Sequence, residues 1–458
     1  MKDVSRRWFM KTGSTMRLAA GMCAVLVPFA LFGAMDRTRF NIGTYRFGDK
    51  VPGFRTEEHV KELKEAGVDF IASMRPGADA EAFYRTMDLF EKYGVGAIPE
   101  GGDAIGASCP VKAFGRVKEG KPMNPAVYVE AAKRFRPHPA IWGIDVGDEP
   151  HGMDLPNVGK AVETCRRLFP TPFLYVNLFP SYARLATNST DIVNSQLGSA
   201  TYKDYIEDYC RYVPLDYISF DIYPYSQSVP KGVGTFFNNL KIAADACVNH
   251  GKALWLVGQV NTFAPGESLA ANKMRYQAFT GLAFGAEVMT WACWTKGWWS
   301  NNVYTTNGVK TVAYDRVKTV NAELRRLGDE CLKYRRVATH FVGYTGRFEV
   351  YLKGCEGVSE PFASTGWFRD VAAADGEPLL VAEMVPRDAR APGAQAIFVM
   401  ASEDPYDENE KERVIRFRPL RRTVEALGVG GPLHVGRDAV GLSTVTLRSN
   451  RAALIWTR

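Results

Sequence analysis

Short apolar runs alternate with longer amphipathic stretches between residue 39 and about residue 335. Apolar runs of this kind, bounded by turn residues, are typical of buried strands in a parallel sheet. Eight runs are therefore predicted to be strands: residues 40–45, 69–74, 96–100, 141–149, 173–179, 217–223, 253–260 and 288–294.

The stretches between these strands carry apolar residues at helical spacing. They predict helices at residues 56–66, 80–93, 125–135, 157–168, 202–211, 235–250 and 269–284, and another at 312–334 after the last strand. Eight strands, each followed by a helix, within about 300 residues fit a (β/α)8 barrel. Residues 36–337 are therefore predicted to form a (β/α)8 TIM barrel of the α/β class.

The pattern changes after residue 336. Apolar runs at residues 348–352, 379–384, 396–400, 414–417, 444–447 and 453–456 are separated by Gly, Pro and acidic turns. Short strands with frequent turns favour antiparallel pairing over βα units. Residues 338–458 are therefore predicted to form an all-β antiparallel sandwich that follows the barrel almost directly.

Alternation along a strand indicates which side chains face the barrel interior. In the fourth strand Trp142, Ile144 and Val146 are bulky and apolar, which suits the side that packs under helices. Asp145 and Glu149 have the opposite parity, so both acids are predicted to face inward.

The same rule turns polar and aromatic side chains inward on the later strands. Asn177 of the fifth strand, Asp221 and Tyr223 of the sixth and Trp294 of the eighth face the interior, whereas Trp291 faces the helices. All four inward residues come late in their strands, and barrel enzymes carry their chemistry at the carboxyl ends of the strands. Together with Glu149 they predict a functional site there.

A structural role for the acids is the alternative. Asp145 and Glu149 would then be buried and tied to Arg75 or Lys296, as acids at a barrel mouth often are. Glu149 fits that role less well than Asp145, because Glu149 lies at the rim and Pro150 ends the strand directly after it.

Composition describes an ordinary globular protein that is rich in aromatic rings. Of 458 residues, 46% are apolar, 12% aromatic and 23% charged, which excludes disorder and coiled coil. The net charge is +7, and much of it comes from the first 35 residues, so nucleic acid is not an expected partner. Glycine-rich phosphate loops and histidine pairs are absent from the sequence, so neither a nucleotide nor a metal is expected, and no cofactor is predicted.

The amino-terminal segment carries an export pattern. Ser5, two arginines, Phe9 and Lys11 precede an uncharged run at residues 18–35, which resembles a twin-arginine export signal in residues 1–35. An uncleaved anchor helix is the alternative. Either interpretation places the bulk of the chain outside the cytoplasm: periplasmic, secreted or on the cell surface. The cysteines lie mostly in apolar stretches and are expected to be small buried side chains.

One motif makes a family resemblance specific enough to name. The sequence Asp148-Glu149-Pro150 at the end of the fourth strand resembles the Asn-Glu-Pro of clan A glycoside hydrolases. Residues 177–182, residues 219–225 and the Trp-rich eighth strand are similar to exported bacterial barrels related to the family 42 β-galactosidases, in which a β-sandwich also follows the barrel. The resemblance implies that Glu149 is the general acid/base.

The second carboxylate departs from the clan pattern. Retaining enzymes of the clan carry a nucleophilic glutamate at the end of the seventh strand, where this chain has Gln259. Three alternatives stay open. Asp221 acts from the sixth strand; Glu100, Asp148, Asp103 or a group of the substrate supplies the charge; or the protein binds sugar without cleaving it.

Aromatic residues around the predicted mouth favour a carbohydrate. Ring faces match the C–H face of a pyranose, and ring N–H and O–H groups orient hydroxyls. The residues predicted to contact substrate are Asp148, Asn177, Tyr223, Tyr225, Gln259, Trp294, Trp298 and Trp299. The sequence thus predicts a hydrolase of β-linked oligo- or polysaccharides with Glu149 and Asp221 as catalytic acids. The alternative is a non-catalytic carbohydrate-binding envelope protein, and the oligomeric state is not predicted.

Overall fold

The computed structural model describes residues 33–48, 51–77, 79–100, 135–169, 173–183, 192, 195–226, 231–262, 268–295, 299–353, 355, 362, 364, 366–388, 395–402, 410–421 and 423–457. The export pattern therefore lies almost entirely outside the described residues. The predicted helix 125–135 lies outside them too, except for its last residue.

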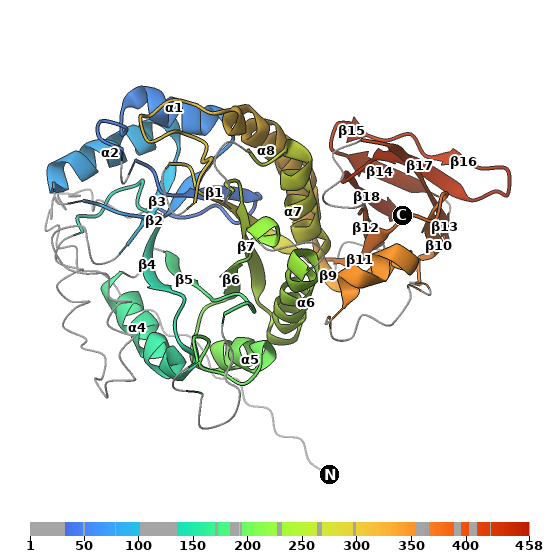
Figure 1. Ribbon diagram of the computed structural model, residues 1–458, viewed down its shortest axis with the longest axis horizontal. Helices are drawn as coiled ribbons and strands as arrows, with labels where there is room; N and C mark the ends of the chain where they lie inside the picture. The colour runs from blue at the N-terminus through green and yellow to red at the C-terminus, as the bar shows by residue number, and fades with distance from the viewer. Residues whose placement is uncertain are drawn as a thin grey trace, which may run out of the picture. The chain divides into compact units, whose positions relative to one another are not determined.

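Eight parallel strands form the first part of the fold (Figure 1). They are β1 (Asn41–Tyr45), β2 (Phe70–Met74), β3 (Gly96–Pro99), β4 (Gly143–Asp148), β5 (Phe173–Asn177), β6 (Tyr217–Asp221), β7 (Ala253–Gln259) and β8 (Ala286–Ala292). Six of them make a curled sheet in the order β3-β2-β1-β8-β7-β6, and β4 pairs with β5. Parallel bridges connect Ala97 to Ile141 and Leu178 to Phe220, at the two places where the sheets meet. This arrangement is consistent with a TIM-like barrel.

Helices surround the strands (Figure 1). They are α1 (Glu57–Glu65), α2 (Ala80–Tyr93), α4 (Leu155–Leu168), α5 (Tyr202–Tyr212), α6 (Lys231–His250), α7 (Ala271–Ala283) and α8 (Val312–Cys331). Side-chain caps start several of them where the sequence supplies a hydroxyl or carboxylate, as at Thr56, Asp79, Thr201 and Thr311. Two 3-10 turns, η4 (Gly152–Asp154) and η6 (Pro224–Ser226), follow β4 and β6.

Aromatic rings fill the lower half of the barrel. Trp255 is almost fully buried, and its ring lies 4.6 Å from that of Tyr175 and 5.3 Å from that of Phe70, measured between centroids. Phe173 and Tyr217 complete the cluster, each with its ring centroid 5.7 Å from that of Trp255. The interior at this level is thus a packed core, and the carboxyl ends of the strands lie above it.

Two antiparallel sheets form the second part of the fold, consistent with a β-sandwich. One sheet contains β9 (Tyr334–Val342), β11 (Leu379–Pro386), β12 (Gln395–Ala401), β14 (Val424–Gly428), β15 (Gly431–Pro432) and β18 (Ala452–Thr457). The other contains β10 (Phe368–Ala373), β13 (Glu412–Pro419), β16 (Gly436–Arg437) and β17 (Ser443–Arg448). Between β9 and β10 lies a further 3-10 segment, η7 (Gly346–Leu352).

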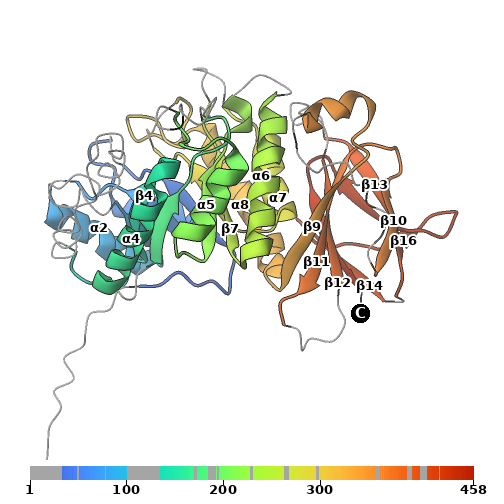
Figure 2. The ribbon, with the colours of Figure 1, turned by 90° about the horizontal axis from the view of Figure 1, so that it is seen from below.

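The sandwich packs on helices of the barrel. Contacts join α7 to β11 and β12 and α6 to β9, and Figure 2 shows these elements side by side. A buried ion-pair network lies in this contact: Arg275 of α7 pairs with Glu410 at 3.6 Å, and Glu323 of α8 pairs with Arg451, just before β18, at 3.9 Å. Charged groups therefore join the two parts of the fold.

No helix in the part of the chain that the structure describes is both long and apolar enough to span a membrane. The six described cysteines carry free thiols. Cys165, Cys247, Cys293 and Cys331 are buried, which agrees with the expectation from their apolar surroundings.

Candidate active site

A cavity of about 330 Å³ opens at the carboxyl ends of the barrel strands. Its wall combines three acids, one cation, one amide and four aromatic rings. The lining residues are Tyr45, Arg46, Asp148, Glu149, Asn177, Tyr182, Asp221, Tyr223 and Trp299. This size and this mixture of rings with a few converging polar groups suit a small-molecule site.

The three acids come from the ends of two strands. Asp148 is the last residue of β4 and Glu149 follows it, while Asp221 is the last residue of β6. The backbone N–H of Glu149 donates to the carbonyl oxygen of Asn177 at 2.8 Å, which holds the end of β4 against β5. Because all three carboxyl groups line one cavity, a bound molecule can contact all of them.

Glu149 has a strained backbone. Its φ of 51° lies in the left-handed region, which residues with a Cβ rarely adopt. Arg46 and Trp299, with φ values of 64° and 73°, share this conformation and line the same cavity. Strain of this kind persists only where the surroundings enforce it, and it is concentrated at functional sites.

Asn177 connects two of the acids. Its amide nitrogen donates to Oδ1 of Asp221 at 2.8 Å and to Oδ1 of Asp148 at 3.3 Å, and its Oδ1 accepts from the Ser219 hydroxyl at 3.3 Å. The amide is therefore fixed by its neighbours. It holds the Asp221 carboxylate in one orientation at the edge of the cavity.

The electrostatics favour a proton on Glu149. Burial, followed by the charges of Asp221 and Asp148, raises the pKa of Glu149 to about 9. Burial and the charge of Asp148 raise the pKa of Asp221 to about 7, while hydrogen bonds from Asn177 and Tyr223 act in the opposite direction. Near pH 8 Glu149 is therefore mostly protonated and Asp221 mostly ionised, which are the states that a proton donor and its anionic partner require.

The cation on the cavity wall is already partnered. Arg46 donates to Glu100 at 2.7 Å, and Arg75 approaches the other oxygen of Glu100 at 3.4 Å. Glu100 is thus a buried ion-pair partner and not a wall residue. Asp145 also has structural partners, because it accepts hydrogen bonds from the Ser73 hydroxyl and from the backbone N–H of Gly147.

Four of the residues predicted to contact substrate line the cavity. Asp148, Asn177, Tyr223 and Trp299 all line the cavity, and the rings of Tyr223 and Trp299 meet edge to face at 4.7 Å. Glu149 and Asp221 line it too, so the structure brings together both predicted catalytic acids. Trp298 and Asp103 lie outside the described residues.

Three other predicted residues do not line the cavity. Trp294 is fully buried, and its ring packs against those of Tyr304 and Tyr314, because β8 ends at Ala292 and strand alternation no longer governs position 294. The structure therefore makes Trp294 a core residue. Trp291, by contrast, donates to Asn321 of α8, which confirms its helix-facing prediction.

Gln259 and Tyr225 are joined by a hydrogen bond and do not line the cavity. The Gln259 side chain accepts from the backbone N–H of Tyr225 at 3.1 Å and donates to the carbonyl of Asn261 at 2.9 Å, and it is fully buried. The Tyr225 hydroxyl donates to the carbonyl of Lys273 in α7 at 3.2 Å. Both residues therefore join the loops after β6 and β7, which corrects their assignment as substrate contacts.

Tyr45, Arg46 and Tyr182 also line the cavity but were not predicted from the sequence. Tyr45 ends β1 and Arg46 follows it, so the rule that selects the carboxyl ends of strands would have found both. Tyr182 lies in a loop after β5, where alternation gives no signal. Its side chain is 41% exposed, so it is the most accessible ring on the wall.

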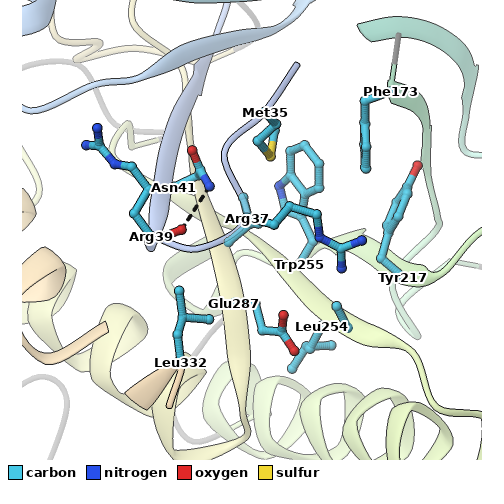
Figure 3. Close-up of a pocket in the computed structure, with 12 residues that line it drawn as sticks. Met35, Arg37, Arg39, Asn41, Phe173, Tyr217, Leu254, Trp255, Glu287 and Leu332 are labelled. Atoms are coloured by element: carbon cyan, nitrogen blue, oxygen red, sulfur yellow. Dashed lines mark hydrogen bonds between the residues drawn. The ribbon is translucent and has the colours of Figure 1, made fainter. Parts of the chain in front are cut away.

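A smaller apolar pocket lies at the opposite end of the barrel (Figure 3). Phe173, Tyr217 and Trp255 line it from the starts of β5, β6 and β7. The carboxylate of Glu287, which lines this pocket, accepts a hydrogen bond from Arg387. This pocket therefore lacks the converging acids of the upper cavity.

In the described ranges no group of three or more His, Cys, Asp and Glu side chains is arranged to hold a metal ion.

Similarity to known proteins is confined to solved structures. No family model and no curated protein sequence matches the chain. Among solved structures, a β-galactosidase from the psychrophilic Marinomonas ef1 matches with 11% identity and a TM-score of 0.46, over 64% of this chain and 62% of that one. This chain thus spans less than two thirds of that enzyme's length.

Two further solved structures match at similar levels. A family 39 glycoside hydrolase from the gut symbiont Bacteroides cellulosilyticus WH2 matches with 11% identity and a TM-score of 0.45, over 93% of this chain and 83% of that one. Saccharomyces cerevisiae Gas2p in complex with laminaripentaose matches with 10% identity and a TM-score of 0.40, over 60% and 59%.

Proposed function

We propose that the protein is a glycoside hydrolase of β-linked oligo- or polysaccharides. One observation carries the proposal: Glu149, with a raised pKa, shares a cavity with the carboxyl groups of Asp148 and Asp221. Cleavage of a glycosidic bond requires one carboxylic acid that keeps its proton and a second carboxylate that is ionised. The ordering of the two pKa values matches that requirement.

Each residue then has a role. Glu149 donates its proton to the oxygen of the departing sugar, and Asp221 acts as the anionic partner, either on water or on the sugar carbon. Asn177 fixes the Asp221 carboxylate through its 2.8 Å hydrogen bond. The rings of Tyr223 and Trp299, on the same wall, offer apolar faces to a pyranose.

We further propose that the enzyme is exported through its twin-arginine segment and that its relatives are the barrels related to family 42 β-galactosidases. The motif at residues 148–150 supports the second proposal. An extracytoplasmic location would bring the cavity to polymeric glycans.

A non-catalytic carbohydrate-binding protein is the second candidate. Its support is Gln259, which stands where retaining enzymes of the clan carry their nucleophile and which is buried in structural hydrogen bonds. If Asp221 does not complete the reaction, the same cavity would bind a sugar without cleaving it.

Turnover on a broad panel of β-linked oligosaccharides distinguishes the two candidates. The full chain would be incubated with each glycan, the release of new reducing ends quantified, and the binding of the same glycans measured by calorimetry. Release that depends on Glu149 supports the hydrolase. Binding without release, which is unchanged in Glu149→Gln, overturns it in favour of the binding protein.

A further inference from the structure

A second polar cavity lies at the amino-terminal side of the barrel. It has a volume of about 300 Å³ and lies where the starts of β7 and β8 meet the beginning of β9 and the end of β11. Five basic side chains line it against two carboxylates, Asp216 and Glu287. The basic residues are Arg37, Lys252, Arg335, Arg336 and Arg387.

Both carboxylates are already paired. Glu287 accepts from Arg387 at 2.6 Å, and Asp216 pairs with Arg37. Figure 3 shows Arg37 and Glu287 from the neighbouring apolar pocket, which they also line. The charges of Lys252, Arg335 and Arg336 are therefore in excess of the acids on the cavity wall.

Arg336 is buried with a free donor. Its side chain is only 5% exposed, its Nε donates to the Thr339 hydroxyl at 2.6 Å, and its Nη2 donates to Asp245 of α6 at 2.9 Å. Nη1, at the other end of the same guanidinium, is buried without a hydrogen-bond partner in the described part of the chain. A buried donor of this kind is costly unless something accepts from it.

Arg335 is a further basic residue of the cavity lining. It lies next to Arg336 on β9, it is exposed, and no ion pair to it is found among the described residues. Asp245, the acid nearest to Arg336, is held by both Arg336 and Lys241, at 2.9 and 2.6 Å. The acids around the cavity are thus occupied, whereas Nη1 of Arg336 keeps a donor for a ligand.

We propose that this cavity binds an oxyanion of the phosphate type. Guanidinium groups match the geometry of phosphate oxygens, and several positive charges around one cavity favour such an anion over a neutral ligand. The volume exceeds that of one phosphate ion, so the cavity also accommodates a phosphate group attached to a small sugar. This site is independent of the proposed glycosidase activity, because it lies at the other end of the barrel.

Titration calorimetry of the full chain tests the proposal, with inorganic phosphate in one arm and a sugar monophosphate in the other. Sodium chloride of equal ionic strength controls for screening. We expect saturable binding in at least one arm, about tenfold weaker in Arg336→Gln, which removes the unpartnered Nη1, and in Arg335→Gln. Tighter binding in the sugar phosphate arm would identify an esterified phosphate as the ligand; tighter binding of inorganic phosphate would identify the free ion.

Arg437→Gln is the matched control. Arg437 is an exposed arginine on β16, the edge strand of the second sheet of the sandwich, and it does not line this cavity. Its phosphate affinity should equal that of the parent. Absence of saturable binding in both arms overturns the proposal. So does an equal loss of affinity in Arg437→Gln and Arg335→Gln, because binding would then depend on net charge alone.

Discussion

Glu149 combines three features that act on one carboxyl group. Its backbone is held in a left-handed conformation, its side chain is largely removed from bulk water, and two further acids line the same cavity. The backbone sets the direction of the side chain, and burial with the negative neighbours sets its affinity for a proton. Each of these effects suits a residue that must deliver a proton at one place.

Replacement of Glu149 by Gln tests the proton donor directly. Gln keeps the shape of the side chain but cannot release a proton, and general acid catalysis typically contributes about 10² to 10⁴ in rate. We expect kcat on a cleaved glycan to decrease by a factor of about 10² to 10⁴, while the far-ultraviolet circular dichroism spectrum stays unchanged. The exposed Glu412→Gln variant in β13 serves as the control and should keep the parent rate.

The pH dependence of kcat/KM tests the two acids together. Asp221 must lose its proton, so the rate should rise with pH through about 7, and Glu149 must keep its proton, so the rate should fall through about 9. A pH–rate profile from pH 5 to 10 measures both limbs. A maximum at pH 5 would contradict this assignment, because Asp221 would then be protonated at the optimum.

Strand parity predicted the position of some site residues and not of others. Glu149, Asn177, Asp221 and Tyr223 line the cavity at or just after the ends of their strands, as the pattern indicated. Gln259 has a similar position at the end of β7, but the loop residues Tyr225 and Asn261 bond its side chain. Such a contact between two loops leaves no trace in the alternation of either strand.

The eight strands of the barrel show how far element boundaries can be predicted. The ranges predicted for β1, β2 and β7 differ from the observed ones by one residue at one end. For β8 the prediction of 288–294 is displaced from the observed Ala286–Ala292. Apolar residues continue past the end of that strand into the core, so the sequence does not mark where pairing stops. The error in Trp294 follows from this displacement.

The ring cluster inside the barrel should dominate the stability of its strands. Trp255→Ala removes a fully packed ring, together with its 2.8 Å hydrogen bond to Thr290 of β8. Substitutions of this kind cost about 3 to 5 kcal/mol. Urea unfolding measures the change, and Val440→Ala, at a position that is 74% exposed, should change the free energy of unfolding by less than about 0.5 kcal/mol.

At the scale of the whole molecule, the boundary between barrel and sandwich differs from the prediction. Strand β9 starts at Tyr334, shortly after α8 ends at Cys331, and pairs with β11 along its whole length. The prediction started the sandwich at residue 338. Arg335 and Arg336 interrupt the apolar pattern, and the pairing of Arg336 with Asp245 becomes visible only when β9 is seen against α6.

The ion pairs between the two parts should make them unfold together. Glu323→Gln removes the carboxylate that pairs with Arg451 of the sandwich at 3.9 Å and with Arg275 of α7, which is 9% exposed, at 2.7 Å. Loss of one member of a buried pair costs about 3 to 5 kcal/mol. We expect one calorimetric transition in the parent and a lower midpoint in the variant. Asp370→Asn removes an exposed pair with Arg418 and should cost about 0 to 1 kcal/mol; an equal effect of the two changes would contradict the prediction.

The free energy of unfolding should decrease as the pH rises, because of the acids that line the cavity. Glu149 and Asp221 bind protons more tightly in the folded than in the unfolded chain, because their pKa values are raised on folding. Their contribution is therefore complete near pH 4 and is lost as the pH rises through about 7 and about 9. Between pH 5 and 9 we expect Tm to fall, and to fall less in the double variant Glu149→Gln/Asp221→Asn. An unchanged slope in that variant would refute this explanation.

The left-handed backbone at Glu149 affects the outcome of selecting variants of this protein for thermal stability. Glycine adopts that conformation without penalty, so Glu149→Gly would relax the turn and remove one of three crowded acids in a single step. A library sorted by heat resistance alone would therefore enrich clones that lack the proposed proton donor. Useful robustness has to be sought elsewhere in the chain, under a screen that scores product at every round.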